Sequence, residues 1–314
     1  MNFACTAWRL AKRSMAAGLV AAVALGAGMT SAQAQSEAPL AGTLAKVRSA
    51  GAVTVGYRES SIPFSYLNDR KEPIGYSIEL CKQLVDAMSE AVHKTLAIRW
   101  VPVTAASRID AVANGQVDLE CGSTTSNLER QKRVAFSPTM FVSGTKLLVK
   151  KGSPARDFRD LAGKAVAVTA GTTNEKTMRD LSERFKLNMS ILVSADHAES
   201  FALVKSGKAD AFATDDVLLY GLIAQDKAAT KGPGDYQVVG DFLSYDPYGV
   251  MYRKNDPQIA RVVNKAFETL AQDGEIQRQY KRWFLRKLPS GISLDLAMSP
   301  QLETILQTMA VKPE

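Results

Sequence analysis

Short β-rich runs that alternate with amphipathic helical patterns restrict the fold of this chain more than any other feature. The run Ala52 to Tyr57 is predicted to be a strand, and Tyr76 to Ala91 carries apolar residues at a helical spacing. The same order begins again at Lys164 to Thr169, with a helix after Gly171 and further strand and helix patterns up to Ala213. Such alternation is typical of α/β domains with largely parallel sheets. The sequence therefore predicts two similar α/β units in succession.

The segments around the second unit predict a hinge. Phe141 to Lys151 is strand-like and precedes the second unit, and another strand-like segment, Tyr248 to Arg253, follows it. The helical pattern Pro257 to Gln272 and the aromatic segment Tyr280 to Phe284 have no unit of their own, so we expect them to return to the first unit. The chain then crosses between the units twice, and paired crossings of this kind form hinges.

The first 34 residues have the pattern of a cleavable secretory signal. Arg9, Lys12 and Arg13 precede an apolar run from Met15 that ends at Ala32-Gln33-Ala34. The run is too short for a transmembrane span, and Cys5 lies ahead of it, where it cannot serve as a lipid anchor. We expect cleavage after Ala34 and export, which leaves 314 minus 34, or 280, residues, enough for two small cores.

Charge and histidine content argue against two classes of function. Loss of the signal removes three positive charges and no acids, so the formal net charge falls from +7 to +4, and the remaining basic residues are interleaved with acids. Nucleic acid is therefore a poor partner. His93 and His197 lie far apart without a ligand-spaced cluster, so we expect neither a metal nor another cofactor.

The mature chain has two cysteines, Cys81 and Cys121, in a compartment that favours oxidation. Cys81 falls on the apolar stripe of a predicted helix, and Cys121 ends a predicted strand. The sequence does not decide between a disulfide and two buried thiols.

Several stretches in the same order resemble the polar amino-acid binding proteins of bacterial ABC importers, solute-binding protein family 3, and most of all their glutamate/aspartate-binding branch. The resemblance runs from Gly51 to Phe284 and rests on these stretches: Tyr57-Arg-Glu-Ser-Ser-Ile-Pro-Phe-Ser-Tyr66, Glu120-Cys-Gly-Ser-Thr-Thr-Ser-Asn-Leu-Glu-Arg-Gln131 and Gly249-Val-Met-Tyr-Arg-Lys-Asn-Asp256. One such stretch alone is a weak signal, whereas the ordered set is specific.

This resemblance implies the two-lobed periplasmic binding protein fold of type II, with two α/β lobes joined by a two-strand hinge. We expect residues 35–141 and 243–314 to form lobe 1 and residues 142–242 to form lobe 2. The implied function is capture of L-glutamate or L-aspartate in the periplasm for delivery to the membrane permease of an ABC importer. A monomer without enzymatic activity is implied as well.

The resemblance also assigns the residues that hold the ligand's α-carboxylate and α-ammonium groups. Arg130, Ser123 and Thr125 match carboxylate positions in the first lobe, and Thr173 and Asp215 match positions in the second. Burying either charge of an amino acid without a partner is costly. A planar guanidinium can hold both carboxylate oxygens, which suits Arg130, and the helix start at Thr173 favours an anion. Asp215 is expected to receive the ammonium group.

Three further positions face the ligand's side chain in the acidic-ligand branch. These are Arg58, where relatives that take basic amino acids tend to carry a carboxylate, together with Arg108 and His197. We expect guanidinium groups to outnumber acids in the pocket, so that a ligand with two negative groups and one positive group balances it. Ala105 stands where acidic-ligand relatives often have serine, which affects the preference between glutamate and aspartate.

Each assignment has a simpler structural alternative. Arg130 can belong to a solvated charged face, Arg108 can pair with Asp110, and Asp215 or its neighbour Asp216 can cap the following helix. Alternatives also exist at the level of function. A periplasmic dehydratase of the cyclohexadienyl type uses the same fold and needs a general acid, for which His197 or Glu120 are the candidates. A receptor's ligand-sensing domain is the other alternative.

Overall fold

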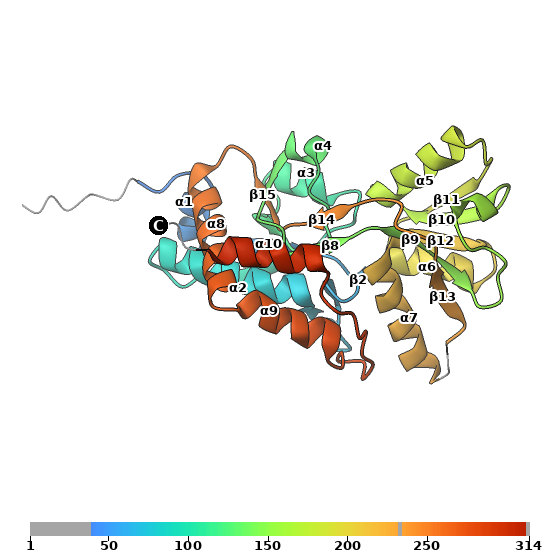
Figure 1. Cartoon of the computed structure of the whole chain (residues 1–314). Helices are drawn as coiled ribbons and strands as arrows, with labels where there is room; N and C mark the ends of the chain where they lie inside the picture. The colour runs from blue at the N-terminus through green and yellow to red at the C-terminus, as the bar shows by residue number, and fades with distance from the viewer. Residues whose placement is uncertain (1–38, 232–233, 312–314) are drawn as a thin grey trace, which may run out of the picture. The chain divides into compact units, whose positions relative to one another are not determined.

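The first sheet contains strands from widely separated parts of the chain. In the computed structural model (Figure 1), which describes residues 39–231 and 234–311, its strand order is β5-β1-β6-β15-β7. The strands are β1 (Ala52–Tyr57), β5 (Ala97–Pro102), β6 (Leu119–Glu120), β7 (Val134–Phe136) and β15 (Met251–Arg253). β1 pairs in parallel with β5 and β6, whereas β15 is antiparallel to β6 and β7. The chain thus returns to this sheet after building the second one.

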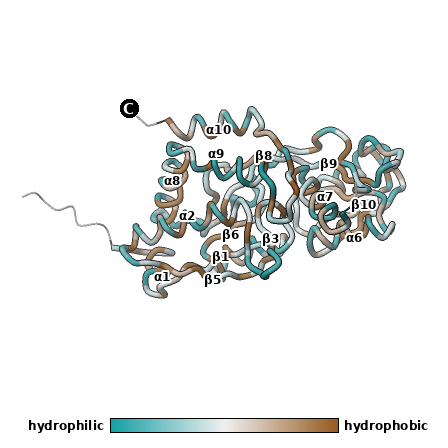
Figure 2. Tube along the Cα trace, turned by 90° about the horizontal axis from the view of Figure 1, so that it is seen from below, coloured by the Kyte–Doolittle hydropathy of each residue, from teal (hydrophilic) through white to brown (hydrophobic). Residues whose placement is uncertain are grey.

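Helices cover both faces of the first sheet. The helices are α1 (Gly42–Ala50), α2 (Tyr76–Ala91), α3 (Arg108–Ala113), α4 (Leu128–Gln131), α8 (Pro257–Gln272), α9 (Glu275–Tyr280) and α10 (Pro300–Ala310). One core cluster joins Val53 of β1 to Leu84 of α2 and Phe267 of α8, and a second joins Val112 of α3 to Met251 of β15. α8 carries both hydrophobic and hydrophilic residues (Figure 2), and its buried residues recur at the helical spacing expected for a helix that buries one face.

The second sheet has the order β11-β10-β12-β9-β13. Its strands are β9 (Thr145–Lys150), β10 (Ala165–Thr169), β11 (Ser190–Ser194), β12 (Ala211–Asp215) and β13 (Tyr236–Val239), and its helices are α5 (Thr173–Arg184), α6 (His197–Lys205) and α7 (Asp216–Thr230). Alternate residues of β10 enter different cores: Val166 and Val168 pack with Met178 of α5, whereas Ala167 packs with Phe201 of α6. The sheet is mixed, because β10 pairs in parallel with β11 and β12 whereas β9 is antiparallel to β12 and β13. Both of its faces are buried.

Two antiparallel strands connect the lobes that contain these sheets. They are β8 (Phe141–Ser143) and β14 (Asp246–Tyr248), and Phe141 pairs with Tyr248. The Phe64 ring packs on both, with ring centroids 4.9 Å from Phe141 and 5.1 Å from Tyr248. Phe64 is thus a core residue at the connection. Residues Leu40 to Glu314 form one compact unit, which contains both lobes and this connection. The predicted two-lobed α/β fold with a two-strand hinge is confirmed.

The C-terminal segments return to the first lobe, as expected. Trp283 and Phe284, in the π-helical turn Lys281–Leu285, belong to the same core cluster as β1 and α2. Leu302 and Leu306 of α10 join that cluster as well. The predicted bounds of β1, α2 and α8 match the structure, but the strand predicted to end at Cys121 is reduced to the two residues of β6, Leu119–Glu120. Residues 248–253 likewise form two strands rather than one.

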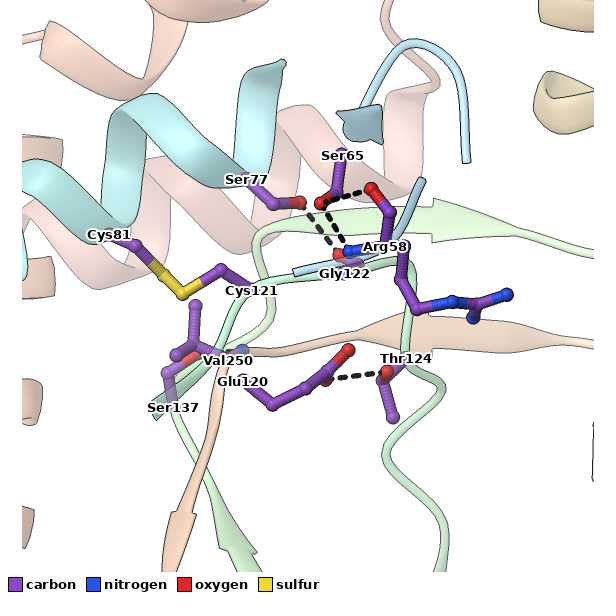
Figure 3. Close-up of a disulfide and its surroundings, with 10 residues drawn as sticks. All are labelled: Arg58, Ser65, Ser77, Cys81, Glu120, Cys121, Gly122, Thr124, Ser137 and Val250. Atoms are coloured by element: carbon purple, nitrogen blue, oxygen red, sulfur yellow. Dashed lines mark hydrogen bonds between the residues drawn. A yellow bond between two sulfur atoms is a disulfide. The ribbon is translucent and has the colours of Figure 1, made fainter. Parts of the chain in front are cut away.

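A disulfide joins Cys81 of α2 to Cys121, the residue directly after β6 (Figure 3). The sequence left open whether these cysteines are bonded, and the structure brings them together from positions 40 residues apart. Ser77, one turn earlier on α2, donates from its hydroxyl to the Gly122 carbonyl at 2.7 Å. The disulfide and this hydrogen bond therefore hold the segment that follows β6 against α2.

A helix long and apolar enough to span a bilayer does not occur between residues 39 and 231 or between 234 and 311. Over the same ranges, His, Cys, Asp and Glu side chains form no group of three that could hold a metal ion. The predicted signal peptide, residues 1–34, lies outside the described part of the chain.

Candidate functional site

A narrow pocket lies where residues of the two lobes meet. It is lined by these residues: Arg108, Ser123 and Thr125 from the first lobe, and Thr172, Thr173, Asn174, His197, Asp215 and Leu218 from the second. The structure therefore gathers most of the predicted site residues around one cavity. Arg58 and Arg130, the other two, do not line this cavity. Arg130 bonds the carbonyl of the lining residue Thr125, and Arg58 lies beside Gly122, the residue before Ser123.

Arg58 follows directly after β1 and is only 1% exposed. Its backbone N–H donates to Ser65 Oγ at 2.8 Å, and the Ser65 hydroxyl donates back to the Arg58 carbonyl at 3.2 Å. This exchange fixes the backbone, whereas the two terminal guanidinium nitrogens have no hydrogen-bond partner among the described residues. Burial, and then the charge of Arg108, lower the pKa of Arg58 to about 9. The group remains a cation near neutral pH and lacks an acceptor.

Arg108 begins α3 and is also buried. Its Nη1 donates to the Ser123 carbonyl at 3.3 Å, but its Nε has no partner within the described chain. Burial lowers the pKa of Arg108, and the nearby Glu120 acts in the opposite direction. The alternative pairing with Asp110 is not seen, because Asp110 forms its ion pair with Arg133.

Arg130 is half-buried and connects the two lobes. It lies on α4, whose first turn is capped by the Asn127 side chain accepting from the Arg130 backbone N–H. Its Nη1 donates to the Thr125 carbonyl at 2.9 Å, and its Nη2 donates to the Gly171 carbonyl of the second lobe at 3.2 Å. Burial, followed by the charge of Arg108, lowers the pKa of Arg130 to about 10. Arg130 thus bonds a pocket residue, Thr125, and does not belong to a fully solvated surface.

Helix starts bring two second-lobe residues to the pocket. Thr173 is the first residue of α5, and the Thr172 side chain caps that helix by accepting from the Glu175 N–H. His197 is the first residue of α6, yet it is only 1% exposed. Its Nδ1 lies 2.9 Å from Thr169 Oγ1. Burial and the charges of Arg58 and Arg108 hold the pKa of His197 well below its usual value, so the ring is neutral near pH 7.

Asp215 ends β12 with both carboxylate oxygens engaged. Asn174 Nδ2 donates to Oδ1 at 2.8 Å, and the Tyr248 hydroxyl, from the crossing strand β14, donates to Oδ2. Burial and the neighbouring Asp246 raise the pKa of Asp215 to about 7, although these hydrogen bonds lower it. The Asp215 side chain does not cap α7. Asp216 instead accepts from Ser143 Oγ at 2.7 Å and does not line the pocket.

The structure also reveals polar groups to which the sequence interpretation gave no binding role. Glu120 is fully buried, and Asp246 is buried and accepts from Thr125 Oγ1 at 3.0 Å. The expectation that guanidinium groups outnumber acids is therefore wrong. Arg58, Arg108 and Arg130 are accompanied by the buried carboxylates Glu120, Asp215 and Asp246. Glu120 lay within the quoted motif, but Asp246 and Tyr248 carried no signal, because only folding brings β14 to the pocket.

The fold and the pocket define a class, that of two-lobed binding proteins with a charged site where the lobes meet. The sequence matches the bacterial extracellular solute-binding proteins, family 3, over residues 53–286, and the chain belongs to that family. The predicted resemblance is confirmed.

Named relatives are similar over nearly their whole length. The glutamate/aspartate import solute-binding protein of Escherichia coli is 40% identical, with 92% of this chain and 94% of the relative covered. The L-glutamate/L-aspartate-binding protein of Pseudomonas aeruginosa is 43% identical, with 85% and 88% covered. These relatives are binding proteins.

Solved structures show the same fold. An ancestral arginine-binding protein bound to glutamine matches with a TM-score of 0.67 and 27% identity, covering 75% of this chain and 99% of that protein. An ancestral amino acid-binding protein described as a precursor of cyclohexadienyl dehydratase matches with a TM-score of 0.65 and 30% identity, covering 77% and 99%.

Proposed function

We propose that this protein is a periplasmic solute-binding protein that captures an acidic L-amino acid, glutamate or aspartate, for delivery to the permease of an ABC importer. The observation that carries the proposal is the pair of buried guanidinium groups, Arg58 and Arg108: both terminal nitrogens of Arg58 and the Nε of Arg108 lack acceptors among the described residues. Buried donors without partners cost free energy, and a ligand carboxylate supplies the missing acceptors. The names of the relatives support the same ligand class.

The two ends of the ligand meet different groups. At the distal end, Arg58 and Arg108 bind the side-chain carboxylate, and the neutral His197 ring adds a polar contact without a third ionic charge. At the other end, Arg130, Ser123, Thr125 and Thr173 bind the α-carboxylate, and Asp215 accepts from the α-ammonium group. The structure supports the second set of roles through two contacts: Arg130 bonds Thr125 and Gly171, and Asp215 lines the same pocket as Thr125.

Binding works by closure of the two lobes over the ligand. We assign residues 35–141 and 243–314 to lobe 1, residues 142–242 to lobe 2, and the hinge to β8 and β14. Contacts that form only when the lobes meet, such as that between Arg130 and Gly171, shift the hinge population toward the closed form. The permease then recognises that form. We propose that the protein acts as an exported monomer with no catalytic step.

Dehydratase activity is the competing function, because one structural neighbour is described as a precursor of such an enzyme. It requires a general acid beside the leaving group. His197 is neutral, and its Nδ1 lies against Thr169. Glu120 accepts from Thr124 through one oxygen and does not line the pocket. Incubation with prephenate or arogenate is expected to give no turnover.

Titration of the twenty amino acids against refolded, ligand-free protein tests the proposal. We expect L-glutamate or L-aspartate to bind with a Kd near micromolar or tighter, about 8 kcal/mol of binding free energy. Glutamine and arginine are expected to bind at least about tenfold more weakly, because they leave a buried guanidinium without its anion. Tight binding of glutamine or arginine with none of the acidic amino acids would overturn the proposed specificity.

A further inference from the structure

Glu120 is a buried carboxylate that the ligand contacts proposed above do not use. It is fully buried at the end of β6. Its Oε2 accepts from the Thr124 hydroxyl at 2.8 Å, whereas its Oε1 has no hydrogen-bond partner in residues 39–231 and 234–311 (Figure 3). A buried carboxylate with one free oxygen is costly unless positive charge lies nearby.

The backbone at Gly122 brings Glu120 next to Arg58. A Cβ atom placed on Gly122 would lie 2.3 Å from Glu120 Oε1 and 2.9 Å from Arg58 Cγ. The carboxylate and the arginine stem therefore occupy the space beside the same glycine, and a side chain at position 122 would separate them. Figure 3 shows the two side chains leaving neighbouring backbone segments near this position.

Other polar and charged groups surround Arg58 at this end of the pocket. Arg108 lies close enough to lower the pKa of Arg58, and Asp196, at the start of α6, raises it. His197 is neutral here, and the Tyr248 hydroxyl is held by Asp215. Glu120 is thus the carboxylate that acts on both buried guanidinium groups, whereas Asp196 acts on Arg58 and Asp215 on Arg108.

We propose that Glu120 is a specificity-determining residue whose carboxylate offsets one of the two guanidinium charges of Arg58 and Arg108, so that the distal end of the site requires a single negative charge from the ligand. The proposal rests on the proposed function, since it presumes an acidic ligand. Glu120 does not itself touch the ligand. It holds the two guanidinium groups together in the empty site and limits their attraction for the ligand carboxylate.

Replacement of Glu120 by glutamine tests this role, because Glu120→Gln keeps the shape and removes the charge. We expect the ligand-free variant to melt at a lower temperature, since the two guanidinium groups then repel each other without compensation. Glutamate is expected to bind about tenfold more tightly and glutamine about as before, so the glutamine Kd divided by the glutamate Kd rises about tenfold. If the role of Glu120 were purely structural, the variant would bind both glutamate and glutamine more weakly, and that result would overturn the proposal.

Glu129→Gln is the matched control. The substitution removes the same charge as Glu120→Gln and lies nine residues further along the chain. The Glu129 side chain is 79% exposed and forms an ion pair with the exposed Lys132. We expect this variant to leave the glutamate-to-glutamine ratio and the melting temperature unchanged. An equal change in both variants would show that overall charge, and not the position of Glu120, is responsible.

The double variant Arg58→Gln/Glu120→Gln separates this proposal from the proposed function. It removes one charge of each sign, so we expect the ligand-free double variant to be more stable than Glu120→Gln alone, even if the single variant fails to fold. A double variant that is no more stable would overturn the proposal. These melting curves need no ligand, whereas absence of glutamate and aspartate binding by the unmodified protein would contradict the proposed function by itself.

Discussion

At the scale of single residues, burial gives Asp215 a raised pKa, which titration can measure. The carboxylate lies beside Asp246 and away from solvent, which raises its pKa to about 7, and it receives hydrogen bonds from Asn174 and Tyr248. In the unfolded chain its pKa is near the ordinary 3.8. The folded, ligand-free protein therefore binds an additional proton between these two values.

This difference predicts opposite effects of pH on stability and on binding. The contribution of Asp215 to ligand-free stability is present below about pH 4 and is lost as the pH rises to about 7, because only the folded form holds the proton in that window. The ligand's ammonium group needs the ionised carboxylate. We therefore expect the Kd for glutamate to rise by about tenfold for each pH unit below 7, measured by calorimetry from pH 8 to 5.

Asp215→Asn supplies the control for that prediction. We expect it to bind glutamate weakly and with little pH dependence, because the titrating group is gone. A Kd that is constant between pH 8 and 5 in the unmodified protein would contradict the assignment of Asp215 to the ammonium group.

At the scale of elements, the disulfide joins a helix to a strand that carries the binding segment. β6 is only Leu119–Glu120, and the residues after it, Gly122 to Thr125, supply both lobe-1 hydroxyl groups of the pocket. Cys81 on α2 holds Cys121 directly before this segment, and Ser77 holds the Gly122 carbonyl. A short strand that ends in an irregular segment is thereby fixed to a long helix.

Removal of this link is predicted to cost stability more than affinity. Closure of a 40-residue loop restricts the unfolded chain, and we expect Cys81→Ser/Cys121→Ser to lose about 2–4 kcal/mol in denaturant unfolding. The Kd for glutamate is expected to rise by less than about tenfold, because the Ser77 hydrogen bond remains. Thiol titration of the unmodified protein, which should give no free thiol, checks the bond itself. An unchanged melting temperature after reduction would contradict this account.

At the scale of the whole molecule, two glycines of the second lobe lie directly against the backbone of the first. A Cβ atom on Gly221, within α7, would lie 2.3 Å from the Ile62 carbonyl oxygen, and one on Gly171 would lie 2.7 Å from Ala106 Cα. Neighbouring backbone does not move aside as a flexible side chain can. The absence of side chains at these positions therefore sets how closely the lobes approach.

Gly221→Ala is expected to stabilise the second lobe and to weaken ligand binding at the same time. Alanine favours a helix interior over glycine by about 1 kcal/mol. The added methyl group prevents full contact with Ile62, so we expect the Kd for glutamate to rise about tenfold and the ligand-bound protein to remain larger in small-angle X-ray scattering. Gln225→Ala, at an exposed position of the same helix, is the control and should not change the Kd. Unaltered affinity in Gly221→Ala would show that closure does not require this contact.

The sequence by itself determined the elements and their order, because hydrophobic periodicity and helix starts are local properties. It also identified the pocket residues Arg108, Ser123, Thr125, Thr173, His197 and Asp215, through stretches that resemble a known family. Only the tertiary structure paired Cys81 with Cys121, set the Tyr248 hydroxyl on Asp215, and placed Glu120 beside Arg58. These contacts depend on how the crossing strands and sheets bring distant segments together: Thr125 and Asp246, which are hydrogen-bonded, lie 121 residues apart. A local sequence pattern carries no information on contacts between residues so far apart in the chain. The balance of charge around the pocket therefore depends on the tertiary structure.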